Sequence, residues 1–334
     1  MNTIDAFCHL MPSRYAELAM EAAPASSHMF ARAMRMPAMS DMEYRRRLLS
    51  RYPGYVQIPN IVSPPVEALA GPDKSPGIAA IGNDEIHDIV ERDPELYAGF
   101  IGSIPANNIP ASLEEIRRCK DMGARGIQIY THINGEPIDS ERFWPVYEEC
   151  VRNDLPILVH PVGGQRMPEY MSEEYSRYEL WYLIGWPYQT TVAMARLVFS
   201  GIFEDFPDIR ILTHHCGAMI PMLGGRIGNG LKMYGSRTAM ELRDRLTRTR
   251  LKENPIDAFR RFYVDTATCN SAAAIRCGLD FYGAGHVLFA TDMPFDPEDG
   301  AYIEGGIKAI SSLELDESQQ EAIFHRNAEV FFGL

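Results

Sequence analysis

The sequence predicts an α/β fold, a (β/α)8 TIM barrel with insertions on the C-terminal face of the barrel. Eight short β-rich runs alternate with helical stretches along the 334 residues. The runs are apolar throughout, as expected for a parallel sheet that is covered on both faces. Eight such units in a chain of this length favour a closed barrel. A doubly wound open sheet is the alternative, but no glycine-rich phosphate loop follows an early strand.

The eight predicted strands are defined by their apolar character and by the turn residues at their ends. They cover residues 3–9, 55–62, 97–104, 126–131, 155–160, 209–214, 262–267 and 286–292. Helical periodicity marks the segments between them, most clearly in 112–123, 143–155 and 191–206. Many of these segments end in glycine or in an Asn/Asp-rich turn, which is the expected chemistry of a helix C-terminus.

Two segments are longer than a bare barrel requires. Residues 13–54 form a methionine- and arginine-rich insertion that contains YRRRLLSR, and residues 163–190 form an aromatic stretch that ends in WYLIGWPYQT. Both follow predicted strand ends, so we expect both on the C-terminal face, as lids or as subunit contacts. Packing is the ordinary role of such methionines. The whole chain, 1–334, is predicted to be one barrel domain with a lid-like insertion at about 13–54.

The composition narrows the classes of partner and compartment. The chain has 32 basic and 45 acidic residues, a net charge of −13, which argues against nucleic acid or an anionic membrane as a partner. Six scattered cysteines without a CxxC pair indicate reduced thiols. There is no basic and apolar leader and no apolar run of the roughly 20 residues that a membrane span needs. We therefore expect a cytoplasmic protein.

Polar residues gather at the predicted strand ends. A single histidine at such a place is more often a hydrogen-bonded core residue than a ligand. Five of the nine histidines lie there, however, and two aspartates join them; these residues are His9, His132, His160, His214, His215, Asp265 and Asp292. Because the C-terminal ends of barrel strands converge on one point, this grouping predicts a functional site.

The residue types at these ends are those that bind a divalent metal. Histidine nitrogens and carboxylate oxygens are ligands for Zn²⁺, Mn²⁺ or Fe²⁺. A catalytic site keeps three protein ligands and an open position, and His9, His160 and Asp292 supply such a set. One histidine should stay off the metal as a general acid and base, and His215 is the candidate.

Several segments resemble the amidohydrolase superfamily, in the branch of aminocarboxymuconate-semialdehyde decarboxylase and related aromatic-acid decarboxylases. They are IDAFCHLMP, GIQIYTHINGEPID, FWPVYEECVRNDLPILVHP, GWPYQTTVAMARLVFSGIFEDFPDIRILTHHCGAMIPMLGGRI, VLFATDMPFD and RNAEVFFGL, and they span nearly the whole chain. The resemblance implies one divalent metal, most often zinc, held by His9, His160 and Asp292. It implies that His215 rather than His214 is catalytic and that His132 contacts the substrate or a ligand. Strand alternation agrees that only one of the two adjacent histidines can face the site. In the mechanism that we expect, Asp292 would serve as a ligand and as a proton relay.

The first strand departs from the pattern of this family. The family carries His-x-His there, and Phe7 stands in place of the first histidine. Residues 7 and 9 face the same side of a strand, while Cys8 faces the other side. We therefore expect weaker binding, a different preferred metal such as Mn²⁺, or no metal, although three protein ligands are still the usual catalytic number.

The favoured function is non-oxidative decarboxylation of a small aromatic or unsaturated carboxylic acid. Arg47 or Arg51 would anchor the acid, and Phe7 would form an apolar wall for its ring. Hydrolysis of an ester, lactone, amide or C–C bond is the second hypothesis, because it needs the same activated water and histidine. A non-catalytic binding protein without metal is the third. The resemblance also implies a homodimer or homotetramer.

Overall fold

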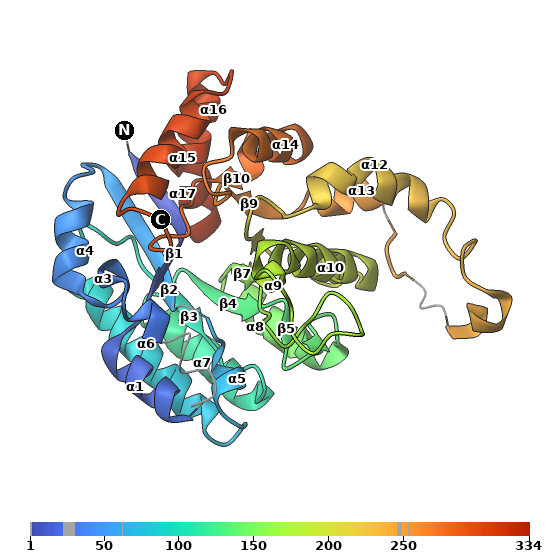
Figure 1. Ribbon diagram of the computed structural model, residues 1–334, viewed down its shortest axis with the longest axis horizontal. Helices are drawn as coiled ribbons and strands as arrows, with labels where there is room; N and C mark the ends of the chain where they lie inside the picture. Colours follow the sequence, from blue (N-terminus) through green and yellow to red (C-terminus); the bar gives the residue numbers. More distant parts are fainter. Residues whose placement is uncertain (1, 23–30, 62, 246–248, 253) are drawn as a thin grey trace.

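The computed structural model describes residues 2–22, 31–61, 63–245, 249–252 and 254–334 (Figure 1). All eight predicted strands are present, several of them shorter than predicted. They are β1 (Thr3–Leu10), β2 (Tyr55–Ile61), β3 (Ile101–Ser103), β4 (Gly126–Tyr130), β7 (Ile157–His160), β8 (Ile211–Thr213), β9 (Tyr263–Asp265) and β10 (Val287–Leu288). The predicted strand residue 62 and Met29 of the methionine-rich insertion lie outside the described residues.

The strands run parallel and close into a barrel. β1 pairs with β2, and the other six form one sheet in the order β10-β9-β8-β7-β4-β3. Backbone hydrogen bonds join the two sheets at both seams. Ala98 N donates to Gln57 O over 2.9 Å beside β2 and β3, and Ala6 N donates to Phe289 O over 2.9 Å between β1 and the end of β10. The predicted barrel is therefore confirmed.

Helices follow the strands and cover the barrel. They are α1 (Ser13–Ala22), α3 (Pro37–Ser40), α4 (Met42–Leu49), α5 (Val66–Leu69), α6 (Ser75–Arg92), α7 (Ile109–Asp121), α8 (Trp144–Arg152), α9 (Leu180–Leu183), α10 (Gly185–Ser200), α11 (Ile202–Asp205), α12 (Ile220–Leu231), α13 (Pro255–Phe259), α14 (Ala272–Tyr282), α15 (Ala301–Ser311), α16 (Glu317–Glu321) and α17 (Asn327–Phe332). A short hairpin of β5 (His132–Ile133) and β6 (Glu136–Pro137) follows β4. None of the helices in the described ranges is both long and apolar enough to cross a membrane.

The helix ends show why these segments fold as predicted. α7 begins after Asn108, whose side chain accepts a hydrogen bond from Ala111 N at 3.2 Å, and it carries a proline in its first turn. α10 ends at Gly201, whose φ of 84° suits a residue without a side chain. The three segments with the clearest helical periodicity correspond to α7, α8 and the pair α10 and α11.

The inside of the barrel is apolar except at its C-terminal end. Phe7 packs in the interior cluster with Leu158 and Leu212, whereas Cys8 packs in the outer cluster between strands and helices, as the strand alternation predicts. α17 closes the opposite end of the barrel, because Phe331 and Phe332 pack into the same interior cluster. Polar side chains are thereby left to the mouth formed by the carboxyl ends of the strands.

The described parts of the insertion, residues 13–22 and 31–54, pack against the side of the barrel that carries β1 and β2 (Figure 1). In α1, Tyr15 N donates to Glu85 Oε2 of α6 over 2.7 Å. α3 and α4 lie against β1, where Met11 N donates to Met39 O over 2.9 Å. Met39 is fully buried, which confirms the packing role expected for this methionine.

Candidate active site and metal centre

Five polar side chains from four strand ends meet at the mouth of the barrel. We call them the histidine cluster: His9, His160, His214, His215 and Asp292. His9 lies near the end of β1, His160 ends β7, the two adjacent histidines follow β8, and Asp292 follows β10. Ligand atoms of His9, His160 and His214 lie within 4.8 Å of one another, as do those of His214, His215 and Asp292.

Fixed partners orient two of the imidazole rings. His160 Nδ1 lies 2.5 Å from Pro161 O, and His214 Nδ1 lies 2.5 Å from Asp265 Oδ2. A carbonyl or carboxylate oxygen accepts only from an N–H group, so each Nδ1 donates and each Nε2 is the nitrogen left for a partner in the cluster. This is the arrangement found in histidine ligands of metals.

Several ring nitrogens of the cluster have no hydrogen-bond partner in the described part of the chain. His9 Nε2 lies 2.9 Å from Asp292 Oδ1. Within the described residues, His9 Nδ1, His214 Nε2 and His215 Nδ1 are buried and have no hydrogen-bond partner. Buried polar atoms normally have partners. Unsatisfied nitrogens beside a carboxylate therefore fit a bound divalent cation.

The charge states of the cluster suit metal binding. Burial, with His9 and His214 nearby, holds the pKa of His160 well below its usual range. Burial alone would raise the pKa of Asp292, but His214 and His9 hold it well below its usual range. Near neutral pH the cluster thus offers an ionised carboxylate and a neutral imidazole, the forms that bind metals.

The two adjacent histidines carry opposite pKa shifts. Burial and the neighbouring His214 lower the pKa of His215 to about 4. Burial lowers the pKa of His214 too, but the carboxylates of Asp265 and Asp292 outweigh it and raise that pKa to about 10. His215 is therefore neutral near pH 7 and is ready to accept a proton.

Both adjacent histidines reach Asp292, so the expectation that only one of them faces the site is wrong. His214 Nε2 lies 3.3 Å from Asp292 Oδ1, and His215 Nε2 lies 4.0 Å from Asp292 Oδ2. His214 lies on the inward side of its strand, two residues after the interior residue Leu212. β8 ends at Thr213, and His215 has a φ of 58°, so strand alternation no longer applies to it.

Phe7 supports the cluster from inside the barrel. Its ring stacks on that of His214 with centroids 4.0 Å apart and planes 15° apart. Because its side chain has 0% exposed surface, it cannot line the open mouth. This differs from the expectation that Phe7 forms a wall for the substrate.

The structure does not bring His132, Arg47 or Arg51 into the histidine cluster. His132 Nδ1 accepts a hydrogen bond from Gly135 N at 3.1 Å within the β5–β6 hairpin, and burial lowers its pKa. Arg47 is exposed and lies over the ring of Tyr44. Arg51 is exposed as well and pairs with Glu304 of α15 at 3.7 Å.

Arg45 is the arginine of the YRRRLLSR segment that lies next to the site, and the sequence reasoning missed it. Its guanidinium is fully buried. Nη1 donates to His9 O at 2.7 Å and to Ala38 O at 2.8 Å, and Nε and Nη2 donate to Gln57 Oε1. Its position in the sequence could have revealed it, because it shares a helix face with the buried residues Leu48 and Leu49.

Aromatic side chains flank the cluster on two sides. The ring of Trp186, at the start of α10, lies 5.9 Å from that of His160. The ring of Phe295 lies 5.5 Å from that of His9. Both are partly exposed, so they can contact a molecule bound in the mouth.

A family model described as Amidohydrolase matches residues 61–334. The chain belongs to the amidohydrolase family. The curated 2-amino-3-carboxymuconate-6-semialdehyde decarboxylase of Dictyostelium discoideum is 29% identical over 299 residues, which cover 88% of this chain and 77% of that relative. The resemblance read from the sequence is thereby confirmed.

Solved structures of amidohydrolase-family decarboxylases share the fold. The 5-carboxyvanillate decarboxylase LigW from Sphingomonas paucimobilis has a TM-score of 0.83 at 21% identity and covers 100% of this chain and 99% of its own. The 5-carboxyvanillate decarboxylase from Novosphingobium aromaticivorans has a TM-score of 0.84 at 21% identity, with coverage of 100% and 96%. That structure was solved with manganese and 4-hydroxy-3-methoxy-5-nitrobenzoic acid.

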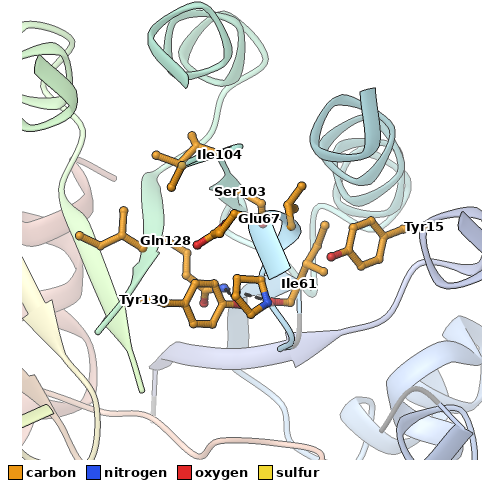
Figure 2. A pocket seen from close by; sticks show the side chains of 11 residues that line it. Tyr15, Ile61, Glu67, Ser103, Ile104, Gln128 and Tyr130 are labelled. Carbon is orange, nitrogen blue, oxygen red and sulfur yellow. Dashed lines mark hydrogen bonds between the residues drawn. The ribbon is translucent and has the colours of Figure 1, made fainter. Parts of the chain in front are cut away.

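A small cavity at the same end of the barrel contains a buried carboxyl group. Figure 2 shows Glu67 of α5 with its carboxyl group near Gln128 and Tyr130 of β4. The cavity measures about 10 Å³, enough for one water molecule. Within the described residues, Glu67 Oε1 and Gln128 Oε1 have no hydrogen-bond partner. Burial raises the pKa of Glu67 to about 7.

Proposed function

We propose that this chain is a metal-dependent non-oxidative decarboxylase of a small aromatic or unsaturated carboxylic acid. The observation that carries the proposal is the convergence of His9, His160 and Asp292 at the barrel mouth, with His215 beside them. The named relatives and structural neighbours support it, since they are decarboxylases of the same family.

His9, His160 and Asp292 would hold one divalent cation. The unpaired His9 Nδ1, the neutral ring of His160 and the ionised carboxylate of Asp292 fit such an ion. When bound, the ion supplies Lewis-acid polarisation of the substrate oxygens. Zn²⁺ suits imidazole ligands, and Mn²⁺ suits a site with carboxylate and substrate oxygens. The manganese in the Novosphingobium decarboxylase supports the second choice as well.

His215 would carry the proton in the reaction. Decarboxylation breaks the bond between the carboxyl group and its carbon, releases CO2 and adds one proton to that carbon. His215 is neutral before the reaction, so it can take a proton from the substrate or from water. Its low pKa then makes the protonated ring a strong donor to the carbon. Asp292 Oδ2, 4.0 Å away, would stabilise the protonated ring and relay the proton.

Trp186 and Phe295 would position the substrate. Their rings flank His160 and His9, so a flat unsaturated acid can lie between them with its carboxyl group toward the cluster. Enclosure by these rings would also exclude water from the reacting carbon.

The test is to measure CO2 release and new carboxylate over a panel of hydroxybenzoates and lactones, with Zn²⁺ and with Mn²⁺. We expect CO2 release from at least one acid and no hydrolysis. New carboxylate from a lactone without CO2 release would instead support the hydrolase hypothesis. The same cluster would also serve a hydrolase, because a metal-activated water could attack a carbonyl.

We also propose a cytoplasmic homodimer or homotetramer. Large apolar side chains are exposed on the 163–190 segment and after α12, among them Met171, Tyr178, Ile184, Met233 and Met240. In Figure 1 the chain after α12 projects away from the barrel. Exposed apolar surface of this kind favours association. Light scattering coupled to size-exclusion chromatography would measure the mass, and a strict monomer would contradict the proposal.

A further inference from the structure

The residue that occupies the expected ligand position of β1 packs directly against a histidine from another strand. Phe7 has no atom that can bind a metal. Its ring stacks on the imidazole of His214 at a centroid distance of 4.0 Å. The side chain of His214 therefore lies beside the place where a histidine at position 7 would reach.

His214 is prepared for metal binding in the same way as a histidine ligand. Its Nδ1 lies 2.5 Å from Asp265 Oδ2, which fixes the ring and leaves Nε2 as the nitrogen that a metal would bind in exchange for its proton. Asp265 is itself held, because Oδ1 accepts hydrogen bonds from Ala267 N at 3.0 Å and Cys216 N at 3.3 Å. His214 Nε2 is fully buried and has no hydrogen-bond partner among the described residues.

Ligand atoms of His9, His160 and His214 lie within 4.8 Å of one another, and a carboxylate oxygen of Asp292 lies close to two of these residues. Ligand atoms about 2.0–2.1 Å from a tetrahedral zinc ion lie about 3.3 Å from each other. Asp292 Oδ1 lies 2.9 Å from His9 Nε2 and 3.3 Å from His214 Nε2. His215 Nε2 lies 4.0 Å from the other carboxylate oxygen, which is a longer separation.

We infer that His214 replaces the missing first-strand histidine, so that His9, His160, His214 and Asp292 form a four-ligand site for a divalent metal. This inference rests on the proposed metal-dependent function and specifies the composition of its metal site. His215 then stays off the metal and is free for proton transfer.

Metal affinity of the full chain, measured without substrate, tests this assignment. Protein stripped with a chelator is titrated with Zn²⁺ and Mn²⁺ against a chromophoric chelator, and Co²⁺ is added separately to record its visible spectrum.

His214→Asn removes Nε2 but keeps a donor for Asp265, and His215→Asn is the matched control. We expect His214→Asn to weaken binding by at least roughly 10- to 100-fold, since even losing a partner of a ligand costs that much. His215→Asn should stay within about threefold of wild type. Circular dichroism of the metal-free proteins checks that both fold.

Two further variants keep the test decisive if His214→Asn folds poorly. Phe7→His alone should change affinity by less than about tenfold, because the ligand set is already complete. The double variant Phe7→His/His214→Asn should regain most of the lost affinity and the wild-type cobalt spectrum.

The outcomes separate this inference from the proposed function. Wild-type affinity in His214→Asn, or a large loss in His215→Asn, would overturn the role of His214 and leave the proposed function standing. A gain of more than about tenfold in Phe7→His would overturn it as well, because it would show an incomplete site. Absence of any divalent-metal binding by the wild-type chain would overturn both.

Discussion

Two carboxyl groups lie at the same end of the barrel, the half-buried Asp292 and the buried Glu67, and their surroundings shift their pKa values in opposite directions. Asp292 faces His9 and His214, which hold its pKa well below the usual range despite burial. Glu67 has no basic partner among the described residues, so burial raises its pKa to about 7. Burial by itself therefore does not prepare a carboxyl group to bind a cation; the imidazoles from two other strand ends keep Asp292 ionised.

The difference between the surroundings of Asp292 and Glu67 also indicates which part of the barrel mouth takes part in the reaction. In the histidine cluster, the surrounding imidazoles keep the carboxylate of Asp292 ionised. This negative charge would attract a cation. The Glu67 cavity has room for about one water molecule and offers no second charged group. We expect changes at the first site to affect turnover and changes at the second to affect stability.

Asp292→Asn should show the largest effect. The change removes the carboxylate that we propose as a metal ligand and as the partner of His215. Turnover should fall by more than roughly 10⁴-fold, because both the metal site and proton transfer are damaged. Steady-state kinetics and metal content measure this, with the exposed Asp280→Asn as control. Activity within tenfold of wild type would remove Asp292 from the mechanism.

His215→Ala should separate proton transfer from metal binding. We expect turnover to fall by roughly 10²- to 10⁴-fold, the usual contribution of a general acid or base, with unchanged metal content. The measurements are kcat and elemental analysis of the purified protein. His325→Ala, which loses only a pair with Glu329 near the surface, is the control. Unchanged kcat with metal still bound would rule out His215 as the proton carrier.

Glu67→Gln should reveal how much the ionised Glu67 carboxyl group lowers the free energy of unfolding. A carboxyl whose pKa rises from 4.5 to about 7 on folding favours the folded state at low pH, and stability is lost as the pH rises through 7. At pH 8 the cost is about 3 kcal/mol. The variant should exceed wild type in unfolding free energy by up to that amount at pH 8 and by less than about 1 kcal/mol at pH 5. Urea unfolding at both pH values, with the exposed Glu114→Gln as control, checks this. A pH-independent difference would contradict the assignment.

Arg47→Ala and Arg51→Ala should show the smallest effects. These side chains are exposed and contact Tyr44 and Glu304 instead of the histidine cluster. Exposed pairs contribute little, so we expect less than about a threefold change in KM for either variant. Measured KM values for the carboxylic acid identified by the CO2 assay decide the point. A tenfold rise would restore the substrate-binding role predicted from the sequence.

The barrel and the meeting point of its polar residues could be predicted from the sequence because both depend on regular periodicity. Eight apolar runs fix the strands, and their C-terminal ends fix where His9, His160 and Asp292 meet. The roles of adjacent histidines could not be predicted this way, because His215 leaves the strand geometry at a positive φ. Among the three arginines of α4, only Arg45 is fully buried, and its helical spacing to the apolar Leu48 and Leu49 is the signal that could have identified it.

The contacts of Arg45 also limit how the mouth of the barrel can open. One guanidinium holds the carbonyl groups of Ala38 and His9, so α3 and α4 are anchored to the end of β1. Swinging these helices outward would leave buried carbonyl groups unpaired and displace His9, which is costly. A substrate must therefore enter where the walls can move independently of β1. The 163–190 segment, which carries Trp181 and Trp186, flanks the cluster through the Trp186 ring beside His160 and lies outside the Arg45 contacts.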